Sequence, residues 1–113
     1  MEKNKRLRDN KDFQKVYKKG RRIWDDKFTV YFLKNGLKDE SKVGFTVNKK
    51  IGNAVIRNYL KRRLKEIIRH HFQLIPKGYN VIIVPKKKIL GFSFKKLEKS
   101  LLYILSISEK GKR

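Results

Sequence analysis

Several residue types are scarce or missing in this sequence of 113 residues. It has no cysteine, which excludes disulfides, thiolate chemistry and cysteine-ligated zinc sites. No apolar run approaches the ~18 residues of a membrane-spanning helix, and the opening MEKNKRLRDN has no hydrophobic signal core. We therefore expect a cytoplasmic protein.

Acidic residues are also scarce. Against 10 Asp and Glu stand 32 Lys and Arg, which gives a formal net charge of +22. Such self-repulsion destabilises a small domain, and a polyanionic partner would relieve it. An anionic membrane is the weaker candidate, because the most basic helix uses its apolar face for the core. We expect nucleic acid as the partner, no membrane contact and no obligate protein partner.

The chain has the length of one domain and shows no linker, internal repeat or low-complexity tract. We expect a single nucleic-acid-binding domain over residues 1–113, with residues 1–8 and 109–113 as flexible basic ends.

Hydrophobic periodicity predicts the order helix, two or three strands, long helix, strand, helix. Asn10 would cap the first helix and Ser93 the last one. The runs 28–33, 43–47 and 81–84 are typical of strands, the second antiparallel to the first, and residues 21–24 fit a further short strand. This order is typical of an α+β domain with one small sheet and helices packed on it.

Residues 53–72, NAVIRNYLKRRLKEIIRHHF, form the most periodic segment, and Asn53 is a natural N-cap. At about 100° per residue, one side of this helix is an apolar stripe of Ile56, Leu60, Leu64, Ile67, Ile68 and Phe72. The opposite side is almost purely cationic, with Asn58 at its centre and Arg57 at its border; its cations include Lys61, Arg62 and Lys65. A helix with only a structural role would interleave carboxylates there. Cations at this spacing can instead neutralise successive phosphates.

The segment NKKIGN, residues 48–53, joins a strand to this helix. It is similar to a phosphate-binding turn, because free N–H groups at a helix start attract anions. It lacks the G-x-x-x-x-G-K-[ST] spacing, which argues against nucleoside triphosphate binding.

The run KKIGNAVIRN from Lys49 to Asn58, continued by Lys61 and Arg62, resembles the "RNR" signature of the bacterial ribonuclease P protein component. Tyr59 and Lys65 stand where members of that family often carry Arg. The resemblance covers nearly the whole chain, with further matches at Arg6–Arg8, Asp12–Tyr17, Val43–Val47 and Tyr79–Val84.

This resemblance implies a protein that assists a catalytic RNA. In the family the RNA subunit, with bound magnesium ions, hydrolyses the bond that frees the 5′ leader from precursor tRNA. The partners would be that RNA and the precursor, and the protein chain alone would bind no cofactor or metal. The implied fold is a mostly antiparallel four-stranded sheet packed with about three helices, with a left-handed βαβ crossover through the signature helix.

The resemblance also implies two binding regions. Contacts to the RNA subunit are expected from Asn48, Lys49, Lys50, Asn53, Arg57, Asn58, Lys61, Arg62 and Lys65. A cleft between the first helix and the sheet would receive the single-stranded leader, with Phe13, Tyr17, Phe28 and Tyr31 in or near it. The residues alone leave open which of these rings are core and which stack on bases; strand alternation only separates Phe28 from Tyr31.

Independent nuclease activity is not expected. His70 and His71 are adjacent on a helix and point about 100° apart, so they cannot act jointly as acid and base. No carboxylate cluster has metal-ligand spacing, so we assign no catalytic residue. The alternatives are a ribosomal or other structural RNA-binding protein without a processing role, and a DNA-binding module. The latter would need a short paired helix before the long one, which the sequence does not show.

Overall fold

The computed structural model describes residues 5–110, and of residues 108–110 only the backbone. Its helices and strands are α1 (Asn10–Lys19), β1 (Arg21–Trp24), β2 (Phe28–Lys34), β3 (Lys42–Phe45), α2 (Ala54–His70), β4 (Tyr79–Pro85) and α3 (Phe94–Lys110). Three short 3-10 helices join them: η2 (Lys49–Ile51), η3 (Phe72–Leu74) and η4 (Lys87–Ile89).

The four strands form one mixed sheet in the order β1-β2-β4-β3. The β1–β2 and β2–β4 pairs are antiparallel, and β3 pairs with β4 in parallel. This confirms the mostly antiparallel four-stranded sheet with three helices, and the short strand over residues 21–24. The strand over 43–47 does run antiparallel to β2 as predicted, but β4 lies between them.

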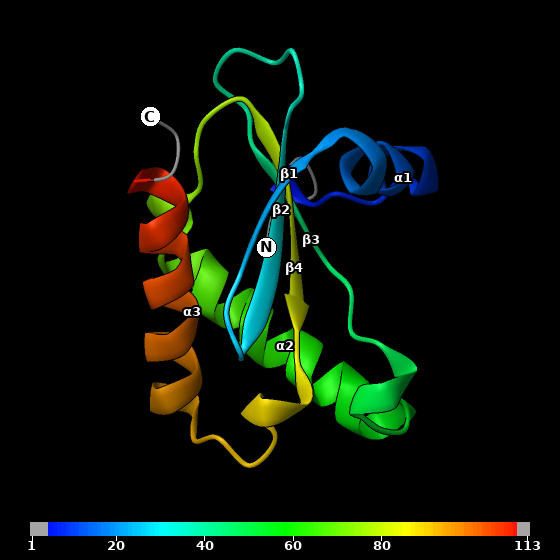
Figure 1. Ribbon diagram of the computed structural model, residues 1–113, viewed down its shortest axis with the longest axis vertical. Helices are drawn as coiled ribbons and strands as arrows, with labels where there is room; N and C mark the ends of the chain where they lie inside the picture. The colour runs from blue at the N-terminus through cyan, green and yellow to red at the C-terminus, as the bar shows by residue number, and fades with distance from the viewer. Residues whose placement is uncertain (1–4, 111–113) are drawn as a thin grey trace.

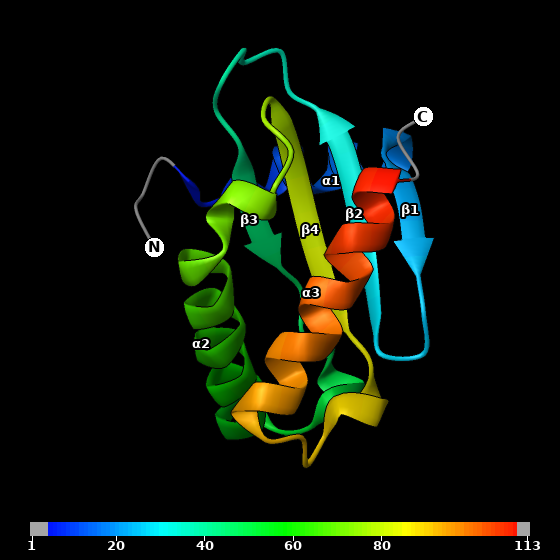
Figure 2. The same cartoon turned by 90° about the vertical axis from the view of Figure 1, so that its left-hand side faces the viewer.

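The parallel pair β3–β4 is joined by α2, and the sense of this crossover can be followed in Figure 2. Both strands point downward there, α2 rises on the viewer's side, and β4 lies to the right of β3. That arrangement is left-handed, whereas most βαβ crossovers are right-handed. It agrees with the expectation from the family resemblance.

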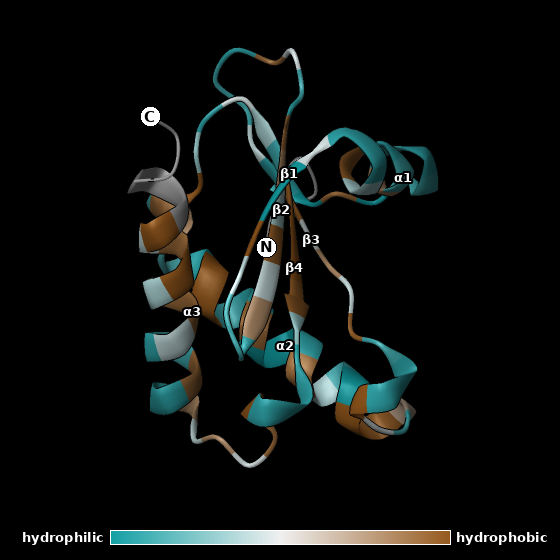
Figure 3. Cartoon of the chain, in the orientation of Figure 1, coloured by the Kyte–Doolittle hydropathy of each residue, from teal (hydrophilic) through white to brown (hydrophobic). Residues whose placement is uncertain are grey.

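Helices cover both faces of the sheet, with α1 on one side and α3 on the other (Figure 1). Side chains alternate along β2: Phe28, Val30 and Phe32 enter the main core with α2 and α3, and Tyr31 and Leu33 face α1. Figure 3 shows hydrophobic and hydrophilic residues alternating along α2 and α3, and the buried hydrophobic residues of both helices belong to the main core with the strands. Each helix therefore contributes one apolar face and leaves its other face for solvent or a partner.

Helix caps agree with the sequence at two of three positions. Oδ1 of Asn53 accepts the N–H of Ile56, and Oγ of Ser93 accepts the N–H of Lys96. At α1 the cap is Asp9, whose Oδ1 accepts the N–H of Lys11. The prediction of Asn10 was one residue late, because both neighbouring side chains can act as caps.

The apolar stripe of α2 is buried at Leu60, Leu64, Ile67 and Ile68 but not at its first member. Ile56 is 40% exposed, because the first turns of α2 lie beyond the end of β3 (Figure 2). Periodicity gives the direction of a side chain but not whether a neighbour reaches it. The stripe's other end also differs from the prediction, since Phe72 lies outside α2, in η3, and is partly buried.

Residues at the expected flexible ends are partly packed. Leu7 is buried, and its N–H donates to the carbonyl oxygen of Val43 at 2.9 Å. At the other end α3 continues to Lys110. Leu7 is thus packed against the sheet, while residues 1–4 and 111–113 lie outside the described part. The flexibility of the two ends stays a prediction. No helix between residues 5 and 110 is long and apolar enough to cross a membrane.

We predict that Ile67→Ala lowers the free energy of unfolding by about 2–5 kcal/mol, because it removes buried methyl groups and leaves a cavity. Ile56→Ala, on the same helix and chemically matched, should cost less than about 1 kcal/mol because that side chain is partly solvated. Urea denaturation of both variants measures the difference. Equal losses at the two sites would show that Ile56 is a core residue after all.

Candidate nucleic-acid interface

The outward face of α2 carries the predicted basic residues. Asn58 and Arg62 are exposed, and Lys61 and Lys65 are half-buried. Arg57 is also half-buried, and its Nε donates to the carbonyl oxygen of Gly52 at 3.2 Å. This hydrogen bond fixes the Arg57 stem against the turn that precedes the helix, as expected for a residue at the border of the apolar stripe.

The turn before α2 is anchored by Ile51, which is buried, and presents Asn48, Lys49 and Lys50 to solvent. The N–H groups of Ile51 and Gly52 are already bonded to carbonyl oxygens of the turn itself. These two N–H groups are therefore not available to an anion, and within the turn the two lysine side chains supply the positive charge.

A second group of cations surrounds a hollow of about 300 Å³ between α2, β3 and the segment before α1. Four of its lining residues are basic: Arg6, Arg8, Lys61 and Lys65. Burial lowers the pKa of Lys65, and the charges of Arg6 and Lys61 lower it further. The fold thus holds these cations together against their mutual repulsion, which a phosphate in the hollow would offset.

The described ion pairs do not involve the residues of this surface. In the part of the chain that the structure describes, ion pairs join Asp26 to Lys27 and Lys88, Glu66 to Arg69 and His70, and Glu98 to His71. None of the residues predicted to bind the RNA subunit belongs to these pairs. We call this surface, Asn48–Lys50 with Asn53, Arg57, Asn58, Lys61, Arg62 and Lys65, the basic face.

Three of the four predicted aromatic residues meet between α1 and the sheet. The ring centroids of Tyr17 and Tyr31 are 4.9 Å apart in an edge-to-face arrangement, and those of Phe13 and Tyr17 are 6.5 Å apart. The Tyr17 hydroxyl is hydrogen-bonded to Oγ1 of Thr46. Partial burial raises the pKa of Tyr17.

Phe28 is not in this group, and its assignment to the cleft is wrong. Its side chain is fully buried on the opposite face of the sheet, in the core shared with α2 and α3. The alternation along β2 had already separated Phe28 from Tyr31, and the structure shows that Tyr31 is on the α1 side.

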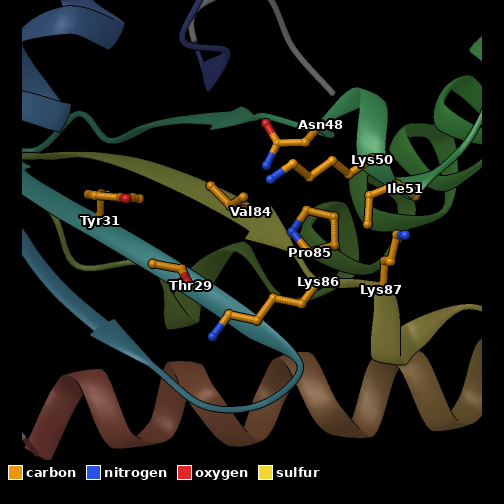
Figure 4. Close-up of a pocket in the computed structure, with 9 residues that line it drawn as sticks. All are labelled: Thr29, Tyr31, Asn48, Lys50, Ile51, Val84, Pro85, Lys86 and Lys87. Carbon is orange, nitrogen blue, oxygen red and sulfur yellow. The ribbon is translucent and has the colours of Figure 1, made fainter.

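Beside Tyr31 the sheet is left uncovered, and a pocket of about 430 Å³ opens there. Figure 4 shows Thr29, Tyr31 and Val84 on the strands, with Asn48 and Lys50 approaching from the η2 side. We call this pocket together with the Phe13–Tyr17–Tyr31 rings the groove. Its lining also includes Ile51, Pro85, Lys86 and Lys87.

Several residues that line these sites were not among the predicted site residues: Thr29, Val84, Lys86, Arg6 and Arg8. Thr29 could have been found, because it alternates with Tyr31 along one strand. The other four depend on tertiary contacts: β4 and the segment before α1 come to the groove and the hollow only through the sheet order.

A cationic helix face adjoining an aromatic groove is the arrangement used for single-stranded nucleic acid, where cations follow the backbone and rings stack on bases. The fold and surface thus define a small α+β nucleic-acid-binding domain. A family model described as Ribonuclease P matches residues 1–108.

Curated relatives and solved structures agree with this match. Ribonuclease P protein components of Finegoldia magna and Alkaliphilus oremlandii are 42% and 40% identical, over 92% and 88% of this chain and 90% and 87% of theirs. The RNase P protein structure from Staphylococcus aureus superposes with a TM-score of 0.85 at 33% identity, covering 94% of this chain and 96% of that one. That from Thermotoga maritima gives 0.81 at 38% identity, covering 88% and 94%. The chain belongs to the ribonuclease P protein family, the protein component of the enzyme that processes the 5′ end of tRNA.

We predict that Gly44→Ala displaces the Phe13 ring. A Cβ built on Gly44 would lie 2.4 Å from Cζ of Phe13, so the ring must move and stability should fall by about 1–3 kcal/mol. In a Phe13→Ala background the same glycine substitution should cost clearly less. A double-mutant cycle by denaturation measures this coupling, and additive losses would contradict the contact.

We also predict opposite effects of Lys65→Met on stability and on binding. The change keeps the length of the stem but removes a charge whose pKa is lowered in the fold. The melting temperature of the free protein at low salt should therefore rise slightly. RNA binding should weaken, and the slope of log K against log salt should fall by about one. Lys99→Met, at an exposed position of α3, is the matched control, and an identical response there would indicate a diffuse charge effect.

Proposed function

We propose that this chain binds the catalytic RNA of ribonuclease P through its basic face and receives the 5′ leader of precursor tRNA in the groove. The observation that carries the proposal is the continuity of the two sites. Asn48 and Lys50 belong to the basic face and also line the groove. An RNA held on α2 and a single strand lying along the sheet would therefore meet at η2.

We further propose that the RNA subunit, with its magnesium ions, performs the hydrolysis. His70 lies 3.6 Å from Glu66 and His71 lies 3.0 Å from Glu98, so the two histidines face different carboxylates on the protein surface. Within residues 5–110 no three His, Asp or Glu side chains form a group that could hold a metal ion. The protein's role is then to position two RNA molecules, and its expected location is the cytoplasm.

The direct test compares cleavage of precursor tRNA at limiting magnesium by the catalytic RNA alone, by the protein alone, and by both together. We expect cleavage at low magnesium to need both. Cleavage by the purified protein alone would contradict the assignment of chemistry to the RNA, and no gain on adding the protein would contradict the subunit role.

Arg62→Ala should weaken assembly with the catalytic RNA by roughly tenfold, the usual effect of losing one charge-assisted hydrogen bond. Arg62 is exposed and outside every described ion pair, so the loss should be in binding rather than in folding. Filter binding at fixed salt measures it. Arg69→Ala is the control on the same helix, because Arg69 is already paired with Glu66; equal losses for the two variants would argue against a defined contact at Arg62.

A further inference from the structure

The single tryptophan of the sequence lies on β1, an edge strand of the sheet. Trp24 belongs to β1 and is 62% exposed. Burying a large aromatic ring is favourable, and Trp24 does not gain this free energy in the free protein. An exposed tryptophan beside a binding site therefore suggests a ligand contact.

The strand register places Trp24 beside the groove. Trp24 is directly opposite Thr29 and Arg22 is directly opposite Tyr31. Directly opposed residues on neighbouring strands project from the same face, so Trp24 and Arg22 share the face of Tyr31. Trp24 and Tyr31 are diagonal neighbours, a relation that separates side chains by roughly 7–8 Å. One continuous single strand can therefore contact both rings.

The guanidinium of Arg22 lies over the Trp24 ring. Its guanidinium carbon lies 4.9 Å from the Trp24 ring centroid, within the range of a cation–π interaction. No carboxylate is paired with Arg22 in the described residues. A guanidinium stacked on an indole still presents its N–H groups at the edge, where a phosphate can accept them.

The hairpin that carries Trp24 is held in place. Oδ1 of Asp25 accepts the N–H groups of Lys27 and Phe28, and the ammonium of Lys86 donates to the carbonyl oxygen of Asp25. Asp26 is paired with Lys27 and with Lys88 of η4, and these cations lower its pKa to about 2. The hairpin is thus held in one conformation, and the two cations beside Asp26 reduce the repulsion between its carboxylate and a phosphate.

We propose that Arg22 and Trp24 form a second stacking site, which extends the groove across β1 and holds a further nucleobase of the single-stranded leader. This inference rests on the proposed function. It commits to single-stranded RNA as the ligand, because an indole face takes the π-face of any base and the adjacent guanidinium takes a phosphate.

Because the sequence has one tryptophan, its fluorescence reports on Trp24 alone. The full chain is titrated with a short single-stranded oligoadenylate and with an abasic ribose-phosphate chain of equal length, while anisotropy of a label on the nucleic acid reports binding. We expect the oligoadenylate to quench tryptophan fluorescence and the abasic chain to bind without quenching. Saturated oligoadenylate binding with unchanged fluorescence would overturn the proposal.

Variants separate stacking from folding. Trp24→Ala should weaken oligoadenylate binding by roughly five- to hundredfold, the range for loss of one base–aromatic stack. Trp24→Phe keeps a ring and should retain most of the affinity. Tyr103→Ala removes a ring that is 60% exposed on α3 and should change nothing. Equal affinity of the wild-type, Trp24→Ala and Trp24→Phe proteins would overturn the site even if every variant folds.

Cleavage assays with the holoenzyme distinguish failure of the stacking site from failure of the proposed function. With precursor tRNA of long and short leader, the wild-type holoenzyme should cleave both, and Trp24→Ala should raise KM for the long leader only. Failure of the wild-type protein to support cleavage would refute the proposed function. Normal wild-type cleavage with the same KM for Trp24→Ala at both leader lengths would refute the stacking site alone.

Discussion

The pairing of β4 with strands on both of its sides is the constraint on which the other features depend. Val81, Ile82 and Ile83 are fully buried because β2 and β3 flank the strand and helices cover both faces. Parallel neighbours cannot be joined by a hairpin, so the chain must leave β3, cross through α2 and return as β4. That crossover brings η2 and the first turn of α2 to the end of the sheet. The position of the basic face is thus a consequence of strand order, and the lysines of η2 reach the groove for the same reason.

The groove exists because one face of the sheet is only partly covered. α1 is a helix of ten residues, and its axis runs across the direction of the strands and not along them (Figure 1). Figure 1 shows α1 over one end of the strands. The ring of Phe13 approaches the backbone of Gly44, where a Cβ would collide with it, so α1 packs closely on the sheet at this end. Beyond Tyr31 the strands remain open, with Thr29 and then Trp24 on the uncovered side.

Local signals in the sequence predicted the helices, the strands and two of the three helix caps. They did not predict the order of the strands in the sheet or the handedness of the crossover. Periodicity, capping and β-branched runs gave α2 with its Asn53 cap, α3 with its Ser93 cap, and the strands including the short β1. The insertion of β4 between β2 and β3 left no local signal, and the left-handed crossover was expected only from the family resemblance. Ile56 and Phe28 are the two residues whose burial was predicted wrongly: Ile56 was expected to be buried and is exposed, and Phe28 was expected near the cleft and is buried. Each has a direction that the sequence specifies, but its burial depends on where the neighbouring element ends.

Charge links the fold to the function. Burial and neighbouring cations lower the pKa of Lys65, so the free protein loses stability by holding Arg6, Lys61 and Lys65 around one hollow. The carboxylates that could have neutralised them lie elsewhere: Glu66 holds Arg69, and Asp26 holds the hairpin that carries Trp24. A polyanion bound at the hollow would offset the repulsion between these cations and so stabilise the fold. Binding and folding should therefore be coupled. On this view the scarcity of acidic residues is what leaves the cations of the basic face available for phosphates.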